Sequence, residues 1–515
     1  MVTAAEDYGT FIGRKTQLAA GSGFEPLWLP EWLFDFQREL TAWALRMGRA
    51  ALYVDTGMGK TAMQLVWAEN VVRHTGRPVL ILAPLAVSAQ TIREGARFGI
   101  TVHRAAGEPT EPGIYVLNYE RLHQASAEHY VGLVCDESSI LKSATGETKK
   151  AVVRFALKLP YRLLATATPS PNDYVELGTS SEALGYLGYS EMLTRFFKQT
   201  DAKGSRIEDV KRSRKDRELE VASAQAGGGD YYGKLSYRVV QDIGKWRMKG
   251  HAVVPFWRWV ASWARACRKP SDVAPGCDDA RFVLPPLEER HHVVKATRPP
   301  DGQLFTMPAF GLQEERDERR RTLEERCALV ASLCASQDRH LVWCHLNAEG
   351  DRLEALIPGS VQVSGADTDE YKEAAVEWFQ GHACICGSPL FKRAPAGPGG
   401  CACGHASGRR VLISKATIFG YGINLQCCAH VVTFASHSWE QHYQCVRRCW
   451  RFGQTRPVVV DVISTDGEVR VRASMERKGK QAEAMFAELV AHMRDATRIA
   501  RANDHTKKQE VIPWL

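Results

Sequence analysis

The sequence predicts an α/β protein made of two blocks, each a parallel sheet covered by helices. The first observation is that short apolar runs alternate with amphipathic stretches, a pattern typical of βαβ units. The second is that this alternation occurs twice, before residue 180 and after residue 285, on either side of a charged, glycine-rich segment. At about 150 residues per domain, a chain of 515 residues has room for several domains.

The composition is that of a folded protein. Hydrophobic residues make up 44% and charged residues 24%, which excludes a disordered chain or a fibre. The 67 Lys and Arg exceed the 59 Asp and Glu, a net charge of +8. This excess permits a nucleic-acid partner without requiring one. We expect no membrane-spanning segment and no secretory leader, because no apolar run is long enough to span a membrane and residues 1–15 lack the charged start and apolar core of a leader. Because the chain has only 14 cysteines, we expect reduced thiols and therefore a cytoplasmic location, or the host cytoplasm if the protein is viral. We also expect no membrane partner.

The first block follows a loose lead-in at residues 1–26 and covers residues 27–180. A helix is expected at 61–74, where apolar residues recur at helical spacing. Strands are expected at residues 50–54, 79–83, 114–117, 132–135 and 162–165.

Residues 181–284 are expected to form a helical and charged insertion. Its charged part contains a basic cluster at 211–217, which fits a solvated loop better than a nucleic-acid contact. Phe256, Trp259 and Trp263 recur at helical spacing. This stripe favours the buried face of a helix over a platform for stacking bases.

The second block covers residues 285–475, and residues 476–515 are expected to form a C-terminal helix and tail. Helices are predicted at 322–334, 370–379 and 480–498, the last with an apolar face. Strands are predicted at residues 340–344, 361–363, 411–414, 430–433 and 458–463.

A phosphate-binding loop is predicted between the first strand and the following helix. Gly57 and Gly59 let backbone amides approach phosphate oxygens. Lys60 can reach the β- and γ-phosphates of a nucleotide, and the Thr61 hydroxyl can ligate Mg²⁺. A strict phosphate loop has glycine at the position of Val54. The strand–loop–helix context nevertheless favours a nucleotide site over a chance match.

A second half of this site is predicted after the strand at 132–135. Asp136 can hold Mg²⁺, and Glu137 can orient and polarise the attacking water. The alternative is an acidic helix N-cap. The phosphate loop upstream favours the catalytic interpretation.

The order of these motifs resembles superfamily 2 helicases and translocases, specifically the Swi/Snf-like branch that moves on duplex DNA. Gln37, within Phe36-Gln37-Arg38-Glu39, resembles the residue with which that family recognises adenine. Further segments that resemble family motifs are 79–90, 114–120, 166–172, 284–286, 415–417, 420–425 and 444–454.

The resemblance covers about residues 37–463 and implies two RecA-like lobes with ATP and Mg²⁺ between them, in a compact prokaryotic or viral form. It implies that Gly422 helps to bind the nucleotide. It also implies that Arg448 and Arg451 reach the γ-phosphate from the second lobe, where positive charge stabilises the transition state. Because these arginines arrive only when the lobes close, hydrolysis would be tied to movement. Ser138 and Ser139 stand where the branch usually has Ala-His or Gly-His.

A small insertion at 382–406 carries two Cys-x-Cys-Gly knuckles. Four thiolates satisfy the tetrahedral geometry of a structural Zn²⁺, although the usual spacing is Cys-x₂-Cys. Reactive or oxidised thiols are the alternative. The predicted zinc ligands are Cys384, Cys386, Cys401 and Cys403.

The sequence therefore favours an ATP-dependent nucleic-acid translocase or helicase that acts on DNA, with duplex DNA preferred. Three alternatives remain open: an RNA helicase, a non-hydrolysing scaffold that binds zinc and nucleic acid, and the motor subunit of a restriction or defence nuclease. The last requires a nuclease as protein partner, because the chain has no recognisable nuclease motif.

Overall fold

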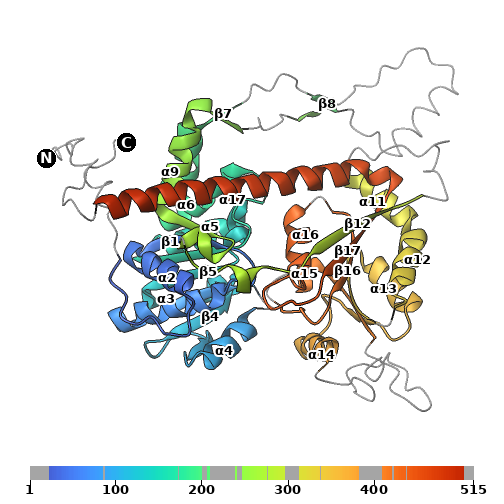
Figure 1. Ribbon diagram of the computed structural model, residues 1–515, viewed down its shortest axis with the longest axis horizontal. Helices are drawn as coiled ribbons and strands as arrows, with labels where there is room; N and C mark the ends of the chain where they lie inside the picture. Colours follow the sequence, from blue (N-terminus) through green and yellow to red (C-terminus); the bar gives the residue numbers. More distant parts are fainter. Residues whose placement is uncertain are drawn as a thin grey trace, which may run out of the picture.

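The chain forms two α/β lobes (Figure 1). The structure is a computed structural model that describes residues 23–84, 87–171, 173–199, 206–208, 238–240, 246–274, 276–295, 312–336, 338–381, 409–419, 423–436 and 438–503. Each lobe is built on a parallel sheet, one of seven strands and one of six. The predicted fold class, two parallel-sheet lobes consistent with RecA-like domains, is confirmed.

The first lobe has the strand order β11-β1-β6-β5-β2-β4-β3, and every neighbouring pair is parallel. All five predicted strands are present, β2 with the predicted bounds. The strands are β1 (Arg49–Val54), β2 (Val79–Ala83), β3 (Val102–Arg104), β4 (Ile114–Asn118), β5 (Gly132–Asp136), β6 (Tyr161–Thr166) and β11 (Ala264–Cys267).

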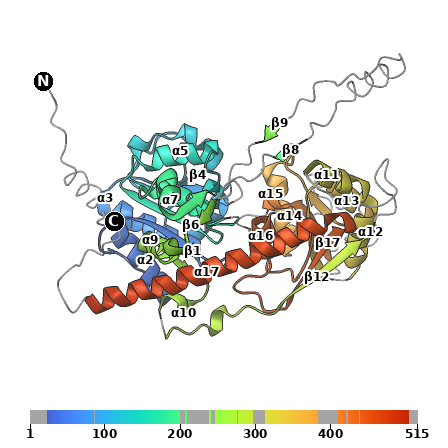
Figure 2. The same ribbon diagram turned by 90° about the horizontal axis from the view of Figure 1, so that it is seen from above.

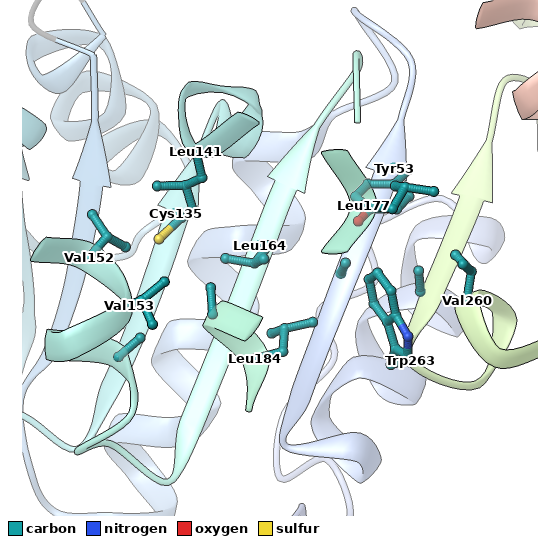
Figure 3. Packing of buried hydrophobic residues seen from close by; sticks show 14 of the residues in the cluster. Tyr53, Cys135, Leu141, Val152, Val153, Leu164, Leu177, Leu184, Val260 and Trp263 are labelled. Carbon is teal, nitrogen blue, oxygen red and sulfur yellow. The ribbon is translucent and has the colours of Figure 1, made fainter. Parts of the chain in front are cut away.

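Helices cover both faces of this sheet, so each face buries its own apolar core. One core includes the residues labelled in Figure 3, among them Tyr53, Leu164 and Trp263. The other lies under α2 and α3. The helices are α2 (Asp35–Met47), α3 (Lys60–Thr75), α4 (Ser88–Arg97), α5 (Glu147–Ala156), α6 (Leu177–Leu184), α7 (Tyr189–Phe196), α9 (Val253–Trp263) and α10 (Pro270–Val273).

Strand β11 was not predicted, although it belongs to the first sheet. It pairs in parallel with β1, with Ala51 opposite Ala264. It directly follows α9, whose Phe256, Trp259 and Trp263 are buried. The predicted buried stripe is therefore confirmed. The four residues Ala-Arg-Ala-Cys are too few to show a strand pattern in the sequence, so the strand is recognised only through its pairing with β1.

The second lobe has the strand order β12-β17-β16-β13-β15-β14, again parallel throughout. The five predicted strands are present, whereas β12 was not predicted, because its sequence LEERHHVV is mostly polar and it forms a sheet edge. The strands are β12 (Leu287–Val294), β13 (Arg339–Cys344), β14 (Val361–Val363), β15 (Arg410–Lys415), β16 (His430–Phe434) and β17 (Val458–Thr465). The helices are α11 (Leu312–Arg321), α12 (Leu323–Leu333), α13 (Asn347–Leu356), α14 (Asp369–Gln380), α15 (Ala416–Phe419) and α16 (Trp439–Val446).

The 35-residue helix α17 (Val469–Asn503) runs along both lobes (Figures 1 and 2). Near its start, Val471 and Met475 pack into the core of the second lobe. Further along, Phe486 and Leu489 pack into the core of the first. The predicted amphipathic helix at 480–498 is confirmed, but the helix begins at Val469. Its first turns pack against the second lobe, so their apolar residues do not continue the face that packs against the first.

Short elements complete the described chain. Two antiparallel pairs are formed by β7 (Phe197–Gln199) with β10 (Trp246–Met248) and by β8 (Arg206–Glu208) with β9 (Arg238–Val240). The 3-10 helices are Tyr119–Gln124, Ala127–His129, Ser138–Lys142, Tyr174–Glu176, Gly250–Ala252, Ala280–Phe282 and Asp466–Glu468. Within the ranges given above, no helix combines the length and apolarity needed to cross a membrane.

Candidate nucleotide site between the lobes

The predicted phosphate loop connects β1 to α3. Gly57 has φ 88° and Gly59 has φ 82°, backbone angles that suit glycine. A Cβ at Gly59 would lie 2.2 Å from Nε2 of Gln37, and one at Gly57 would lie 2.8 Å from the backbone N of Phe452. Both glycines are therefore required by conformation and by close neighbours, one of which belongs to the second lobe.

Lys60 is the first residue of α3. Its Nζ donates a hydrogen bond to the carbonyl of Val54 over 3.0 Å. Burial lowers the pKa of Lys60, while the nearby carboxylates of Glu137, Asp136 and Asp55 oppose this effect. The ammonium thus lies at the base of the loop, within the field of three acidic groups. Thr61 follows it in the first turn of the helix.

Asp136 ends β5 and lies at the same edge of the sheet as the phosphate loop, because the strands are parallel. Its Oδ1 accepts a hydrogen bond from Nε2 of Gln64 over 2.7 Å. Burial, followed by the adjacent charge of Glu137, raises the pKa of Asp136 to about 6. Gln64 lies one turn after Lys60 on α3, so this bond ties the two halves of the site together.

Glu137 has φ 51°, and within the described ranges it is the only residue other than glycine with positive φ. Such a conformation is costly and concentrates at functional sites. Oε2 of Glu137 accepts a hydrogen bond from the Thr166 hydroxyl over 3.2 Å. Its side chain makes no capping bond to the following 3-10 helix. The alternative interpretation as a helix cap is therefore not supported.

Gln37 contacts the phosphate loop directly. Its Nε2 donates to the carbonyl of Met58 over 2.8 Å, and its Oε1 accepts from the backbone N–H of Phe34 over 3.1 Å. The amide therefore joins α2 to the loop, and recognition of a base by Gln37 would have to replace these two bonds. Phe282 stacks on Phe452 with ring centroids 4.8 Å apart, beside Phe34. This places aromatic rings next to Gln37.

The two predicted arginines follow α16 and face the loop from the second lobe. Arg448 is buried, and its guanidinium donates to Oε1 of Gln444 over 2.6 Å. Burial lowers the pKa of Arg448, and Glu137 is the strongest charge opposing this shift. The Cβ of Arg451 would lie 3.4 Å from a Cβ at Gly57. Burial and then the charge of Arg448 lower the pKa of Arg451 to about 10.

Arg451 differs from Arg448 in its hydrogen bonding. Its Nε is buried and has no hydrogen-bond partner among the residues that the structure describes. An unpaired buried donor is costly. This guanidinium is therefore suited to receive an anionic ligand, whereas that of Arg448 is already held by Gln444.

The donor set at this site fits Mg²⁺. That ion prefers oxygen ligands and is usually held by one or two carboxylates together with substrate phosphates. Asp136 supplies a buried carboxylate and Thr61 a hydroxyl close to Lys60. Across the described ranges, no group of three or more His, Cys, Asp or Glu side chains could hold a metal ion by itself.

Several predicted residues lie outside the described ranges. They are Gly422, the four cysteines 384, 386, 401 and 403, and the basic cluster 211–217. Their predicted roles stay predictions.

Sequence reasoning missed the residues that join the lobes. Arg447 forms an ion pair with Asp55 of the phosphate loop, and Lys142 forms one with Glu440. Arg447 lies inside the predicted motif at 444–454, but a single sequence does not show which distant charges meet.

The comparisons with known proteins are sparse. No protein-family model matches the chain. It is 28% identical over 192 residues to "Putative protein p41" of Acyrthosiphon pisum secondary endosymbiont phage 1, a match that spans 31% of this chain and 42% of that protein. The chain thus spans less than half the length of this curated relative. A solved structure of the Sulfolobus solfataricus SWI2/SNF2 ATPase core in complex with dsDNA is similar with a TM-score of 0.35 and 15% identity, covering 86% of this chain and 90% of that one. Neither similarity assigns the chain to a family.

Proposed function

We propose that this protein hydrolyses ATP between its two lobes and uses the energy to move along nucleic acid, with duplex DNA as the preferred track. One observation carries the proposal: the phosphate loop, the carboxylates of Asp136 and Glu137, and two arginines of the second lobe converge between the lobes. None of these groups alone is specific to an enzyme that hydrolyses ATP. Together they are what phosphoryl transfer to water requires.

Each group has a distinct task in this reaction. Lys60 and the amides at the start of α3 bind the β- and γ-phosphates. Thr61 and Asp136 would hold Mg²⁺, which neutralises charge on the phosphates when bound. Glu137, fixed by Thr166, orients the attacking water. Arg451 stabilises the negative charge that develops on the γ-phosphate.

Coupling to movement is supported by the origin of the arginines. They come from the second lobe, so hydrolysis requires the lobes to be closed. The preference for duplex DNA is supported by the resemblance of the ordered motifs to the Swi/Snf-like branch.

ATP hydrolysis measured without polymer, then with duplex DNA, single-stranded DNA and RNA, tests the proposal. Lys60→Ala is the blank, and the exposed Lys158→Ala of the same lobe is the matched control. We expect hydrolysis that duplex DNA stimulates, that Lys60→Ala abolishes and that Lys158→Ala retains. Stimulation by RNA alone would indicate an RNA helicase. Turnover by Lys60→Ala at the wild-type rate, or no hydrolysis under any condition, would refute the proposal and favour a binding scaffold.

A further inference from the structure

Helix α16 presents one face to the first lobe. Glu440 and Tyr443 of α16, together with Arg447, which caps its C-terminal end, are spaced i, i+3 and i+7, so they share a side of the helix. All three contact residues of the first lobe: Glu440 pairs with Lys142, and both Tyr443 and Arg447 contact Asp55. The helix thus touches the first lobe at both of its ends.

At the C-terminal end, Asp55 is fully engaged. The hydroxyl of Tyr443 donates to its Oδ1, and the guanidinium of Arg447 donates to its Oδ2. The backbone N–H of Thr56 also donates to Oδ1, over 2.6 Å. The side chains of Asp55 and Arg447 are each only 9% exposed. A pair this buried is sensitive to loss of either member, because the other charge is left without a partner.

The N-terminal end of α16 meets the other half of the site. Lys142, which pairs with Glu440, ends the 3-10 helix that follows Glu137. Oε1 of Glu440 also accepts a hydrogen bond from the Thr168 hydroxyl over 3.4 Å. Both contacts of α16 are therefore with segments that carry the groups proposed for hydrolysis.

Asp55 is an unfavourable residue beside bound phosphates unless its charge is neutralised. It precedes the loop glycines, and its carboxylate acts on the ammonium of Lys60. An unpaired carboxylate there repels a polyphosphate. Arg447 removes that repulsion only when α16 is docked. Docking of the second lobe and nucleotide binding thus favour each other, which is a coupling between two sites.

We propose that Asp55 and Arg447 are positioning residues that couple lobe closure to nucleotide binding. This inference rests on the proposed function. Arg447 neutralises the loop acid and, as the immediate neighbour of Arg448, sets where that residue and Arg451 lie against the loop. Tyr443 holds the same carboxylate in place.

We expect the two single variants of this pair to differ in nucleotide affinity. Arg447→Gln leaves Asp55 charged beside the phosphates, so nucleotide affinity falls, by about tenfold on the usual scale of such couplings. Asp55→Asn removes the repulsion, so affinity is kept. Both variants also lower turnover, by up to about 100-fold, because α16 docks less firmly and a small displacement of the arginines that follow it lowers the rate. In the double variant Asp55→Asn/Arg447→Gln, nucleotide affinity equals that of the single variant Asp55→Asn. Turnover of the double variant is no lower than that of the single variant Arg447→Gln.

The experiment measures affinity for a fluorescent ATP analogue, single-turnover hydrolysis, and hydrogen exchange of the 439–447 backbone without nucleotide. Lys149→Gln is the control, because it breaks a 2.6 Å ion pair with Glu182 inside the first lobe. We expect faster exchange at 439–447 in the three pair variants and not in Lys149→Gln. Equal affinity losses in the two single variants that add in the double variant would overturn the proposal.

Failure of the proposed function is recognised separately. If the wild-type protein hydrolyses no ATP, the proposed function is wrong, but exchange of α16 still reports on docking. Unchanged exchange in Arg447→Gln would then overturn the role of the pair itself.

Discussion

The hydroxyl of Thr166 donates a hydrogen bond to Oε2 of Glu137 over 3.2 Å. This bond joins the end of β6 to the turn after β5. Two residues later, the hydroxyl of Thr168 reaches Glu440 of the second lobe over 3.4 Å. The proposed water-orienting carboxylate is therefore connected to the second lobe by one short segment. A change in the contact between the lobes can alter the position of Glu137 through this segment.

Glu137→Gln is expected to bind ATP but to lose turnover by about 100-fold or more, the usual contribution of a general base. The amide has the same shape and can still bond to Thr166, but it cannot polarise water. Nucleotide affinity and hydrolysis rate measured on the same preparation check this. The exposed Glu120→Gln is the control. Equal losses of binding and turnover would mean that Glu137 has a structural role.

Arg451→Ala is expected to lower turnover by about 10³-fold, as for loss of an arginine finger, with little change in thermal unfolding. Its Nε has no partner within the described chain, so truncation breaks no such bond there. Arg448→Ala breaks two hydrogen bonds to Gln444 and should also lower the melting temperature. Hydrolysis rates and melting curves of both variants separate the two effects. A wild-type rate in Arg451→Ala would remove its proposed role.

Phe486→Ala is expected to destabilise the first lobe by about 3–5 kcal/mol, the usual cost of deleting a buried phenylalanine ring. Phe486 is 4% exposed and lies in the core of that lobe. The guanidinium carbon of Arg268 lies 4.3 Å from the centroid of the Phe486 ring. Denaturant unfolding followed by tryptophan fluorescence measures the loss. Leu157→Ala, at a side chain that is 50% exposed, should change little. An unchanged midpoint for Phe486→Ala would show that α17 does not stabilise the first lobe.

His340 is expected to make the second lobe less stable in mild acid. Burial, followed by the charge of His430, lowers the pKa of His340 in the folded protein to about 4. In the unfolded chain the pKa of a histidine is about 6.5. Below that value the unfolded chain takes up a proton that the folded one does not. The stabilisation is therefore complete above pH ~6.5 and is lost as pH falls toward ~4, in total about 3 kcal/mol. Unfolding free energies measured across this range should fall less in His340→Gln than in wild type. Parallel curves would contradict the assignment.

Purified protein is expected to contain about one zinc ion per chain, held by the predicted cysteine knuckles. Elemental analysis measures this directly. Cys401→Ser/Cys403→Ser should lose the metal, while Cys277→Ser, far from the knuckles in sequence, should keep it. A wild-type preparation without zinc would favour the alternative of reactive or oxidised thiols.

The sequence by itself determined the two-lobe α/β architecture and most of the elements that carry the proposed chemistry. Strand β2 has the predicted bounds, and β14 does as well. Strand β2 is a short apolar run that is buried along its whole length, and β14 has two buried valines on either side of a half-buried glutamine, so both patterns are local. The phosphate loop is readable for a similar reason: glycines, lysine and threonine at fixed spacing meet a local backbone requirement.

Only the tertiary structure decided what completes the sheets and joins the lobes. Strand β11 has only four residues, too few to be recognised by pattern, and it is defined by its pairing with β1. Asp55 and Arg447 are 392 residues apart, and many other acids and arginines could have paired with either of them. Charge complementarity has no sequence period, so the fold alone selects which charges are buried together. In this chain it joins the phosphate loop to the helix that precedes the two proposed catalytic arginines.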